Sequence, residues 1–246
     1  MKSTIQIEPK NTKFIAHRGL SGIEPENTVL AFECAGNGKY FGIESDVHVT
    51  LDERFVMIHD NDTKRVSGCD FSVENTDFET LRNVSLKDKN GCNQTYLRIP
   101  TLSEYLKTCK TYNKIAVLEI KNRVSFEMIE KIYNCACKEY NLENVLFISF
   151  DYENLVKIRN ISEKAKIQFL CECPVDNQLI EALKEHSFDV DIYEKRLDKN
   201  AIELFHKNGI LVNCWTCDDE TRAKQLIDWN IDYITTNILE PKLKEN

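Results

Sequence analysis

The chain has 246 residues, of which 42% are hydrophobic and 29% are charged, a balance typical of globular proteins. Its net charge of −8 at pH 7 excludes a globally basic surface for nucleic acid or anionic lipid. No apolar run reaches the roughly 18 residues of a membrane span, and residues 1–13 lack the apolar core of a secretory signal. We therefore expect a cytoplasmic protein with no nucleic-acid partner and no stable membrane insertion; composition leaves the oligomeric state open.

The front of the chain is expected to form a strand, a helix and a second strand, at residues 14–16, 28–37 and 42–49. Residues 51–100 do not continue this alternation of strands and helices. They contain a short apolar run at 55–58, polar turns and a helix-like stretch at 77–83. We predict that this segment is a small insertion after the second strand.

From residue 114 onward, strands and helices alternate with short connections. The expected strands are residues 114–120, 144–149, 166–172, 189–193, 210–215 and 233–235, and the expected helices are 125–140, 151–161, 176–186, 198–207 and 219–229. Such a repeat predicts a parallel sheet covered by helices. Eight strands in total predict an α/β fold, a closed (β/α)8 TIM barrel, formed by one domain of residues 1–246. An open doubly wound sheet is the alternative.

Ten cysteines are spread evenly along the chain. Without a secretory signal, we expect reduced thiols and not a disulfide framework. Cys214 and Cys217 have the spacing of a redox or zinc half-site, but no second pair of this kind accompanies them. We expect both to be small buried residues at a strand end.

Charged side chains share one face on two of the expected strands. Glu44 and Asp46 lie two residues apart, as do Glu119 and Lys121, so each pair points to one side of its strand. Carboxylates that reach the same volume need a cation, and a hard divalent ion is the natural partner. Glu119 would add a third carboxylate, and Lys121 a cation for phosphate. Solvated strand ends or a salt-bridged cluster are the alternatives.

Two histidines end apolar runs next to charged neighbours. His17 precedes Arg18, and His59 precedes Asp60. Imidazoles transfer protons near neutral pH, and a guanidinium binds anionic oxygens, so this set predicts phosphate-ester chemistry. His48 is expected to have an orienting or packing role.

The turn Pro25-Glu26-Asn27-Thr28 opens the first expected helix. Asn27 or Thr28 suits the N-cap, and capping alone explains the turn. Nothing in the sequence shows that Glu26 faces the site.

An ordered set of motifs covers nearly the whole chain. In chain order they are HRG-x5-PENT-x3-F from His17 to Phe32, E-x-D-V-x2-T from Glu44 to Thr50, His59-Asp60, Arg65-x2-Gly68, Pro100-Thr101-Leu102-x-Glu104, LEIK from Leu118 to Lys121, Trp215-Thr216 and Asp232-Tyr-Ile-Thr-Thr. With these motifs the chain resembles the glycerophosphodiester phosphodiesterases, barrel-fold enzymes of the phospholipase C-like group. The insertion at residues 51–100 resembles the small insertion of that family. One departure is Asn237, at a place where the family usually carries aspartate.

The resemblance implies hydrolysis of a small-molecule glycerophosphodiester, such as glycerophosphocholine or glycerophosphoethanolamine, to glycerol 3-phosphate and an alcohol. It implies one divalent ion, Mg²⁺ or Ca²⁺, and a neighbouring glycerol hydroxyl as nucleophile. The implied roles are an acid/base pair of His17 and His59, metal ligands Glu44, Asp46 and Glu119, and substrate contacts Arg18, Lys121 and Trp215. Which histidine is the base stays open. The alternatives are a phospholipase C- or D-like enzyme acting on intact lipid and a non-catalytic phosphate-ligand binding module.

Overall fold

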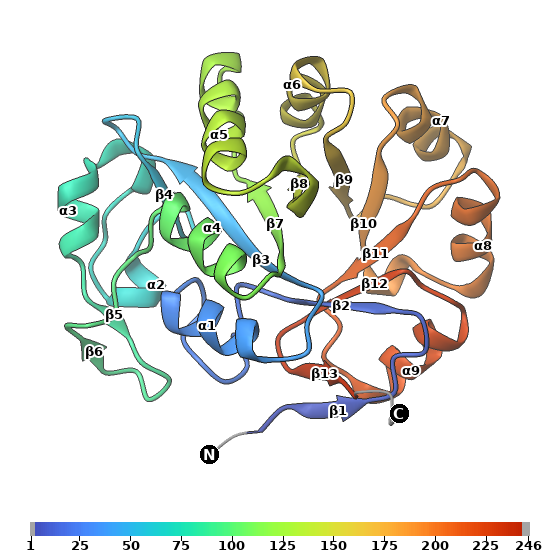
Figure 1. Ribbon diagram of the computed structural model, residues 1–246, viewed down its shortest axis with the longest axis horizontal. Helices are drawn as coiled ribbons and strands as arrows, with labels where there is room; N and C mark the ends of the chain where they lie inside the picture. Colours follow the sequence, from blue (N-terminus) through green and yellow to red (C-terminus); the bar gives the residue numbers. More distant parts are fainter. Residues whose placement is uncertain (1–2, 243–246) are drawn as a thin grey trace.

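Eight parallel strands close into a barrel in a computed structural model that describes residues 3–242 (Figure 1). In order around the barrel they are β2 (Lys13–Ala16), β3 (Gly42–Val49), β7 (Ile115–Ile120), β8 (Val145–Ser149), β9 (Lys166–Cys171), β10 (Asp189–Tyr193), β11 (Val212–Trp215) and β12 (Tyr233–Thr236). The last strand pairs with the first, which closes the sheet. The predicted (β/α)8 TIM barrel is confirmed, and the open sheet is wrong.

Helices cover the outside of the barrel. They are α1 (Val29–Asn37), α4 (Leu102–Thr111), α5 (Phe126–Glu139), α6 (Tyr152–Ile161), α7 (Asn177–Glu185), α8 (Lys199–Lys207) and α9 (Glu220–Asp228). Side chains that accept a hydrogen bond from the first turn fix where these helices begin, as Ser125 does for α5 and Asp151 for α6. Short 3₁₀ turns occupy Leu142–Asn144 and Glu194–Arg196.

The segment between β3 and α4 is the predicted insertion. It contains β4 (Phe55–Met57), α2 (Lys64–Ser67), a 3₁₀ turn (Val73–Asn75), α3 (Phe78–Asn83), β5 (Leu86–Lys87) and β6 (Asn93–Gln94). β4 pairs antiparallel with β3, which anchors the insertion to the second barrel strand. A small apolar cluster of its own, including Val73, Leu81 and Leu97, holds the rest together.

The last barrel strand is followed by a strand, β13 (Leu239–Pro241), which pairs in parallel with β1 (Ile5–Ile7). Figure 1 shows this two-stranded sheet below the barrel. Asn237 lies in the turn between β12 and β13. The pairing of β13 with β1 fixes the position of this turn beside β1.

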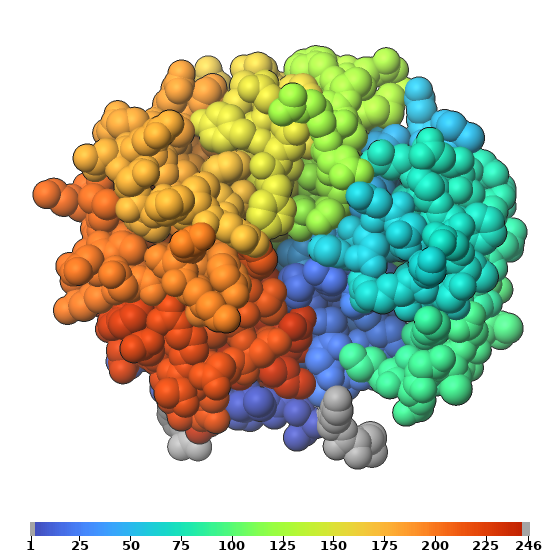
Figure 2. Space-filling view, turned by 180° about the vertical axis from the view of Figure 1, so that it is seen from behind, coloured from blue at the N-terminus to red at the C-terminus, as the bar shows by residue number. Residues whose placement is uncertain are grey.

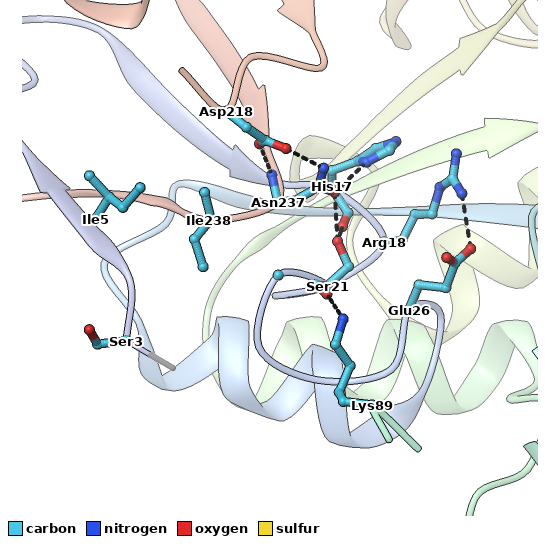
Figure 3. Close-up of a pocket in the computed structure, with 11 residues that line it drawn as sticks. Ser3, Ile5, His17, Arg18, Ser21, Glu26, Lys89, Asp218, Asn237 and Ile238 are labelled. Atoms are coloured by element: carbon cyan, nitrogen blue, oxygen red, sulfur yellow. Dashed lines mark hydrogen bonds and ion pairs between the residues drawn. The ribbon is translucent and has the colours of Figure 1, made fainter. Parts of the chain in front are cut away.

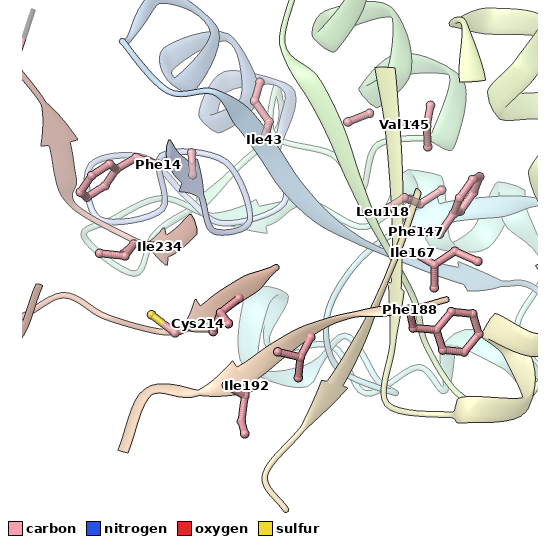
Figure 4. Close-up of a cluster of buried hydrophobic side chains, with 14 of the residues drawn as sticks. Phe14, Ile43, Leu118, Val145, Phe147, Ile167, Phe188, Ile192, Cys214 and Ile234 are labelled. Carbon is pink, nitrogen blue, oxygen red and sulfur yellow. The ribbon is translucent and has the colours of Figure 1, made fainter. Parts of the chain in front are cut away.

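Strand parity divides the core into two layers. Phe14, Leu118, Phe147 and Ile192 belong to the large cluster between barrel and helices, part of which Figure 4 shows. A smaller cluster, with Ile15, Val117, Leu146, Ile148 and Leu170 as its buried members, fills the barrel interior. Polar residues on the inner face lie at the mouth of the barrel, beyond the apolar residues that fill its interior.

Two details differ from the sequence prediction. Helix α4 was not predicted, although Thr101 and Glu104 form a capping box at its start. Helical spacing alone would place Phe126 with Ile129 and Ile132 on the buried face of α5, but Phe126 lies in the first turn and is exposed, and Met128 is buried instead. Within residues 3–242, no helix combines the length and apolar character that crossing a bilayer requires.

All ten cysteines are free thiols. Cys214 and Cys217 are both buried, as predicted, and Cys214 belongs to the outer apolar cluster. Their spacing therefore reflects packing.

Candidate active site

Three buried carboxylates meet at the mouth of the barrel. Glu44 and Asp46 point inward from β3, and Glu119 points inward from β7, where it is the register partner of Asp46. One oxygen from each residue lies within 4.8 Å of the others. All three side chains are buried. The alternation of side chains along the strands predicted that these three carboxylates lie together, and in the structure they do.

Burial and mutual repulsion perturb these groups. Burial, reinforced by Asp46 and Glu119, raises the pKa of Glu44 well above its usual range. Burial and the charge of Asp46 also raise the pKa of Glu119 to about 8. Burial opposes ionisation of Asp46 too, but Lys121 and Arg18 outweigh it and hold the pKa of Asp46 below its usual range. Full ionisation of all three carboxylates would therefore leave negative charge that Arg18 and Lys121 do not balance.

The donor set fits a hard divalent cation. Oxygen atoms Oε1 of Glu44 and Oδ1 of Asp46 are buried without a hydrogen-bond partner. Carboxylate oxygens are the ligands that Mg²⁺ and Ca²⁺ prefer, and an ion there would relieve the repulsion. The three carboxylates can thus hold a metal ion, with the Lys121 ammonium 2.7 Å from Glu119 and 3.6 Å from Asp46.

The Arg18-Gly19 turn wraps the carboxylates with backbone and guanidinium donors. The Arg18 N–H donates to Glu44 Oε2 at 2.8 Å, and its guanidinium lies 2.9 Å from Glu26 and 3.8 Å from Asp46. Arg18 has a φ of 55° and Gly19 a φ of 74°, both in the left-handed region. A Cβ at Gly19 would lie 2.6 Å from the backbone of Ala31, so this turn requires glycine.

Two residues of the PENT turn, Glu26 and Asn27, belong to the site, although the sequence pattern assigned them no role beyond the turn. Asn27 donates to Asp46 Oδ2 at 2.7 Å and accepts from Ser45, while the N-cap of α1 is Thr28. Glu26 faces the site, where it bonds Arg18 and also Arg65 of the insertion. The PENT turn therefore does more than cap a helix: it links the first strand, the carboxylates and the insertion.

His17 is hydrogen-bonded to Asn237, a residue of the loop that follows the last barrel strand, β12. Its Nδ1 lies 2.8 Å from Asn237 Oδ1, and its Nε2 lies 4.0 Å from Glu44 Oε2. Burial, with the positive charge of Arg18, lowers the pKa of His17 to about 4. The ring is therefore neutral near neutral pH. The departure from the family motif at Asn237 therefore concerns the residue that contacts His17 directly.

His59 contacts a carboxylate, that of Asp60, whereas His17 contacts the amide of Asn237. Its Nδ1 lies 2.8 Å from Asp60 Oδ1, and Arg65 bonds the same carboxylate. Burial lowers the pKa of His59, although the nearby Asp46 opposes this shift. His48 Nε2 lies 3.3 Å from the His59 carbonyl oxygen, so it orients the backbone that carries His59. The predicted orienting role of His48 fits this contact.

A small cavity of about 90 Å³ joins these groups at the barrel mouth. It is lined by His17, Arg18, Glu44, His59, Glu119, Asp191, Thr235, Thr216, Ile148, Leu170, Phe150 and Trp215. Trp215 packs edge-on against Phe150 and donates its indole N–H to the Asp191 carbonyl oxygen. Asp191, which the sequence did not single out, is buried with Oδ1 unpartnered, and burial raises the pKa of its carboxyl well above the usual range.

A larger cavity of about 740 Å³ adjoins the small one and shares His17 and Arg18 with it (Figure 3). It extends over Ser21, Asp218 and Asn237, and away from the carboxylates. Figure 2 shows the face turned away from Figure 1, hollowed at its centre where the blue N-terminal residues meet cyan and orange-red segments. The carboxylates Glu44 and Glu119 line the small cavity and not the larger one.

Comparison with known proteins identifies the family. The model of the glycerophosphoryl diester phosphodiesterase family matches residues 17–240. A glycerophosphodiester phosphodiesterase of Caldanaerobacter subterraneus is 30% identical over 228 residues, which cover 92% of this chain and 94% of that protein. An uncharacterised protein of Bacillus subtilis, YqiK, is 34% identical over 235 residues, 93% of this chain and 96% of its own length.

Solved structures agree with the fold. A phosphodiesterase of Oleispira antarctica, in complex with the product sn-glycerol-3-phosphate, superposes with a TM-score of 0.86 at 24% identity, covering 92% of each chain. A glycerophosphodiester phosphodiesterase of Parabacteroides distasonis gives a TM-score of 0.77 at 27% identity, covering 92% of this chain and 93% of its own. The family and the enzyme class predicted from the motifs are confirmed. The chain belongs to the glycerophosphoryl diester phosphodiesterase family.

Proposed function

We propose that the chain hydrolyses glycerophosphodiesters to glycerol 3-phosphate and an alcohol at the barrel mouth. The observation that carries this proposal is a cluster of three buried carboxylates, two of which line one small cavity together with both histidines. The product sn-glycerol-3-phosphate in the Oleispira antarctica phosphodiesterase supports the substrate class.

Arg18 and Lys121 are proposed to bind the phosphate. Arg18 Nε is buried and has no hydrogen-bond partner, so it is a donor available to a phosphate oxygen. Lys121 lies beside Glu119 and Asp46, on the same side of the cavity as the carboxylates. Trp215 and Phe150 give the cavity an aromatic wall, which we propose contacts the carbon atoms of the glycerol.

Glu44, Asp46 and Glu119 are proposed to hold one divalent ion, Mg²⁺ or Ca²⁺. When bound, such an ion supplies positive charge to a non-bridging phosphate oxygen. Arg18 and Lys121 flank the carboxylates, so a bound phosphate would lie among these two cations and the ion.

Proton transfer is proposed to fall to His17 and His59. One ring takes the proton of the attacking glycerol hydroxyl as its oxygen bonds to phosphorus, and the other protonates the alcohol oxygen as its bond to phosphorus breaks. The cyclic phosphate is then opened by water with the two roles reversed. One water is consumed, and both rings return to their starting protonation.

A substrate panel tests the function. The purified protein, loaded with Mg²⁺ or with Ca²⁺, is given glycerophosphodiesters with different head groups, and glycerol 3-phosphate is measured. We expect release from glycerophosphocholine or glycerophosphoethanolamine. Cleavage of phosphatidylcholine vesicles alone would overturn the proposal in favour of a lipid-directed enzyme. Binding of glycerol 3-phosphate without turnover of any panel member would mean a binding module.

We also propose that the protein works in the cytoplasm. Its ten free thiols, several of them exposed, suit a reducing compartment. Fractionation of cells that produce the protein tests this placement, and recovery outside the cytoplasmic fraction would contradict it.

A further inference from the structure

Asn237 lies between His17 and Asp218 (Figure 3). Its side-chain oxygen is 2.8 Å from His17 Nδ1, and its side-chain nitrogen donates to Asp218 Oδ2 at 2.6 Å. The backbone N–H of Asn237 donates to the other oxygen of Asp218, at 2.7 Å. Thr236 Oγ1 also donates to that oxygen. Three donors thus converge on the Asp218 carboxylate, and two of them come from Asn237.

The hydrogen-bond donors and acceptors along His17, Asn237 and Asp218 allow only one orientation of the Asn237 amide. A carboxylate only accepts hydrogen bonds, so the NH₂ end of the Asn237 amide must face Asp218. The carbonyl end must then face His17, where Ser21 Oγ also lies 2.7 Å from it. A carbonyl oxygen only accepts, so His17 Nδ1 must carry the hydrogen. In the neutral ring, Nε2 is therefore left with its lone pair, on the side of Glu44.

We propose that Asp218 and Asn237 are positioning residues that hold His17 in the tautomer with hydrogen on Nδ1, so that Nε2 accepts the proton of the attacking hydroxyl. This inference rests on the proposed function and decides the direction of its first step. The proton passes from the hydroxyl oxygen to His17 Nε2 while the Nδ1 hydrogen stays on its bond to Asn237. His59 is then the ring that protonates the leaving alcohol oxygen.

The pairing also explains why this chain departs from the family motif. An aspartate at position 237 would place a second carboxylate 2.6 Å from Asp218, and like charges at that distance repel. An asparagine offers Asp218 a donor and offers His17 an acceptor. Asn237 is therefore matched to Asp218 in this molecule.

Exchanging the two side chains tests the inference. Asp218→Asn alone removes the group that orients the Asn237 amide, and Asn237→Asp alone creates two facing carboxylates. We expect each single variant to lower kcat by about tenfold or more, with KM changed much less, because the base loses its alignment. The double variant Asp218→Asn/Asn237→Asp restores a donor at 218 and an acceptor at 237, so kcat should return to within about threefold of the wild type.

A second readout does not depend on activity. In ¹⁵N NMR spectra of imidazole-labelled protein, with His17 assigned by comparison with His17→Gln, we expect Nδ1 protonated and Nε2 unprotonated in the wild type and the double variant. Asp218→Asn should give a mixture of tautomers. If the wild type turns over substrate but His17 carries its hydrogen on Nε2, or if the double variant is no better than the singles, the inference is overturned. If the tautomers are as expected but no glycerophosphodiester is cleaved, the proposed function fails instead.

Discussion

Asp46 on β3 and Glu119 on β7 are register partners on neighbouring parallel strands. That pairing, with Glu44 two residues away on the same face, brings three carboxylates within 4.8 Å. The carboxylate cluster is therefore a consequence of strand register and parity, whereas His17, Arg18 and His59 lie in loops around it. A shift of one residue between β3 and β7 would separate these side chains.

Metal-free protein should lose stability as the pH rises. The pKa of Glu119 is raised from an ordinary 4.5 to about 8, mainly by burial, so ionising it in the fold is unfavourable. Its contribution is fully present below pH 4.5 and is lost as the pH rises toward 8. We expect the Tm of the metal-free wild type to fall over this interval, less so for Glu119→Gln and less so with a divalent ion bound. Equal slopes for wild type and variant would contradict the assignment.

Each histidine of the proposed pair should be needed for turnover. His17→Ala or His59→Ala should lower kcat by about 10²–10⁴-fold, the usual contribution of a general acid or base. The Tm should change little, because both rings line a cavity and fill no part of the apolar core. His206→Gln is a matched control, since His206 lies on α8, where it bonds Asp232. Near-normal kcat in both alanine variants would remove them from the mechanism.

Arg18→Lys tests phosphate binding by the guanidinium. A lysine keeps the charge but loses the planar fork that bonds Glu26 and offers Nε to the cavity. We expect KM for glycerophosphocholine to rise by about tenfold, and binding of glycerol 3-phosphate to weaken in step. Unchanged affinity for glycerol 3-phosphate, measured by calorimetry, would place the phosphate elsewhere.

The capping box at α4 gives a prediction for the fold alone. The Thr101 side chain accepts a hydrogen bond from the Glu104 N–H, and the Glu104 carboxylate accepts one from the Thr101 N–H. Thr101→Ala should cost about 1 kcal/mol of unfolding free energy. Urea titration measures this cost, and kcat should stay unchanged. A loss of activity at full stability would mean that α4 acts on the site.

The sequence was informative where periodicity determines position. Counting strands predicted the barrel, and parity placed Glu44, Asp46, Glu119 and Lys121 together, because both follow from alternation along a strand. The Thr101-x-x-Glu104 spacing is also a signal in the sequence, because a capping box of this kind marks the start of α4.

Other parts of the site were beyond the reach of these patterns. Glu26 and Asn27 enter the site through the PENT turn, and its left-handed residue, Asn27, has no periodic signature. Asp218 and Asn237 lie in loops after β11 and β12, and Asn237 contacts His17 only because the barrel closes between β12 and β2. Contacts made by closure depend on three-dimensional distance, which spacing along the chain does not encode.

Release of glycerol 3-phosphate from glycerophosphocholine by Glu119→Gln, compared with the wild type, tests the central claim most directly. The wild type should be active with Mg²⁺ or Ca²⁺, inactive in excess EDTA and active again when the ion is returned. Glu119→Gln should lose at least about 10²-fold in kcat/KM at every metal concentration, whereas Glu203→Gln, on the exposed face of α8, should match the wild type. Full activity of the wild type in EDTA, or of Glu119→Gln with either ion, would contradict a metal-assisted phosphodiesterase site at this barrel mouth.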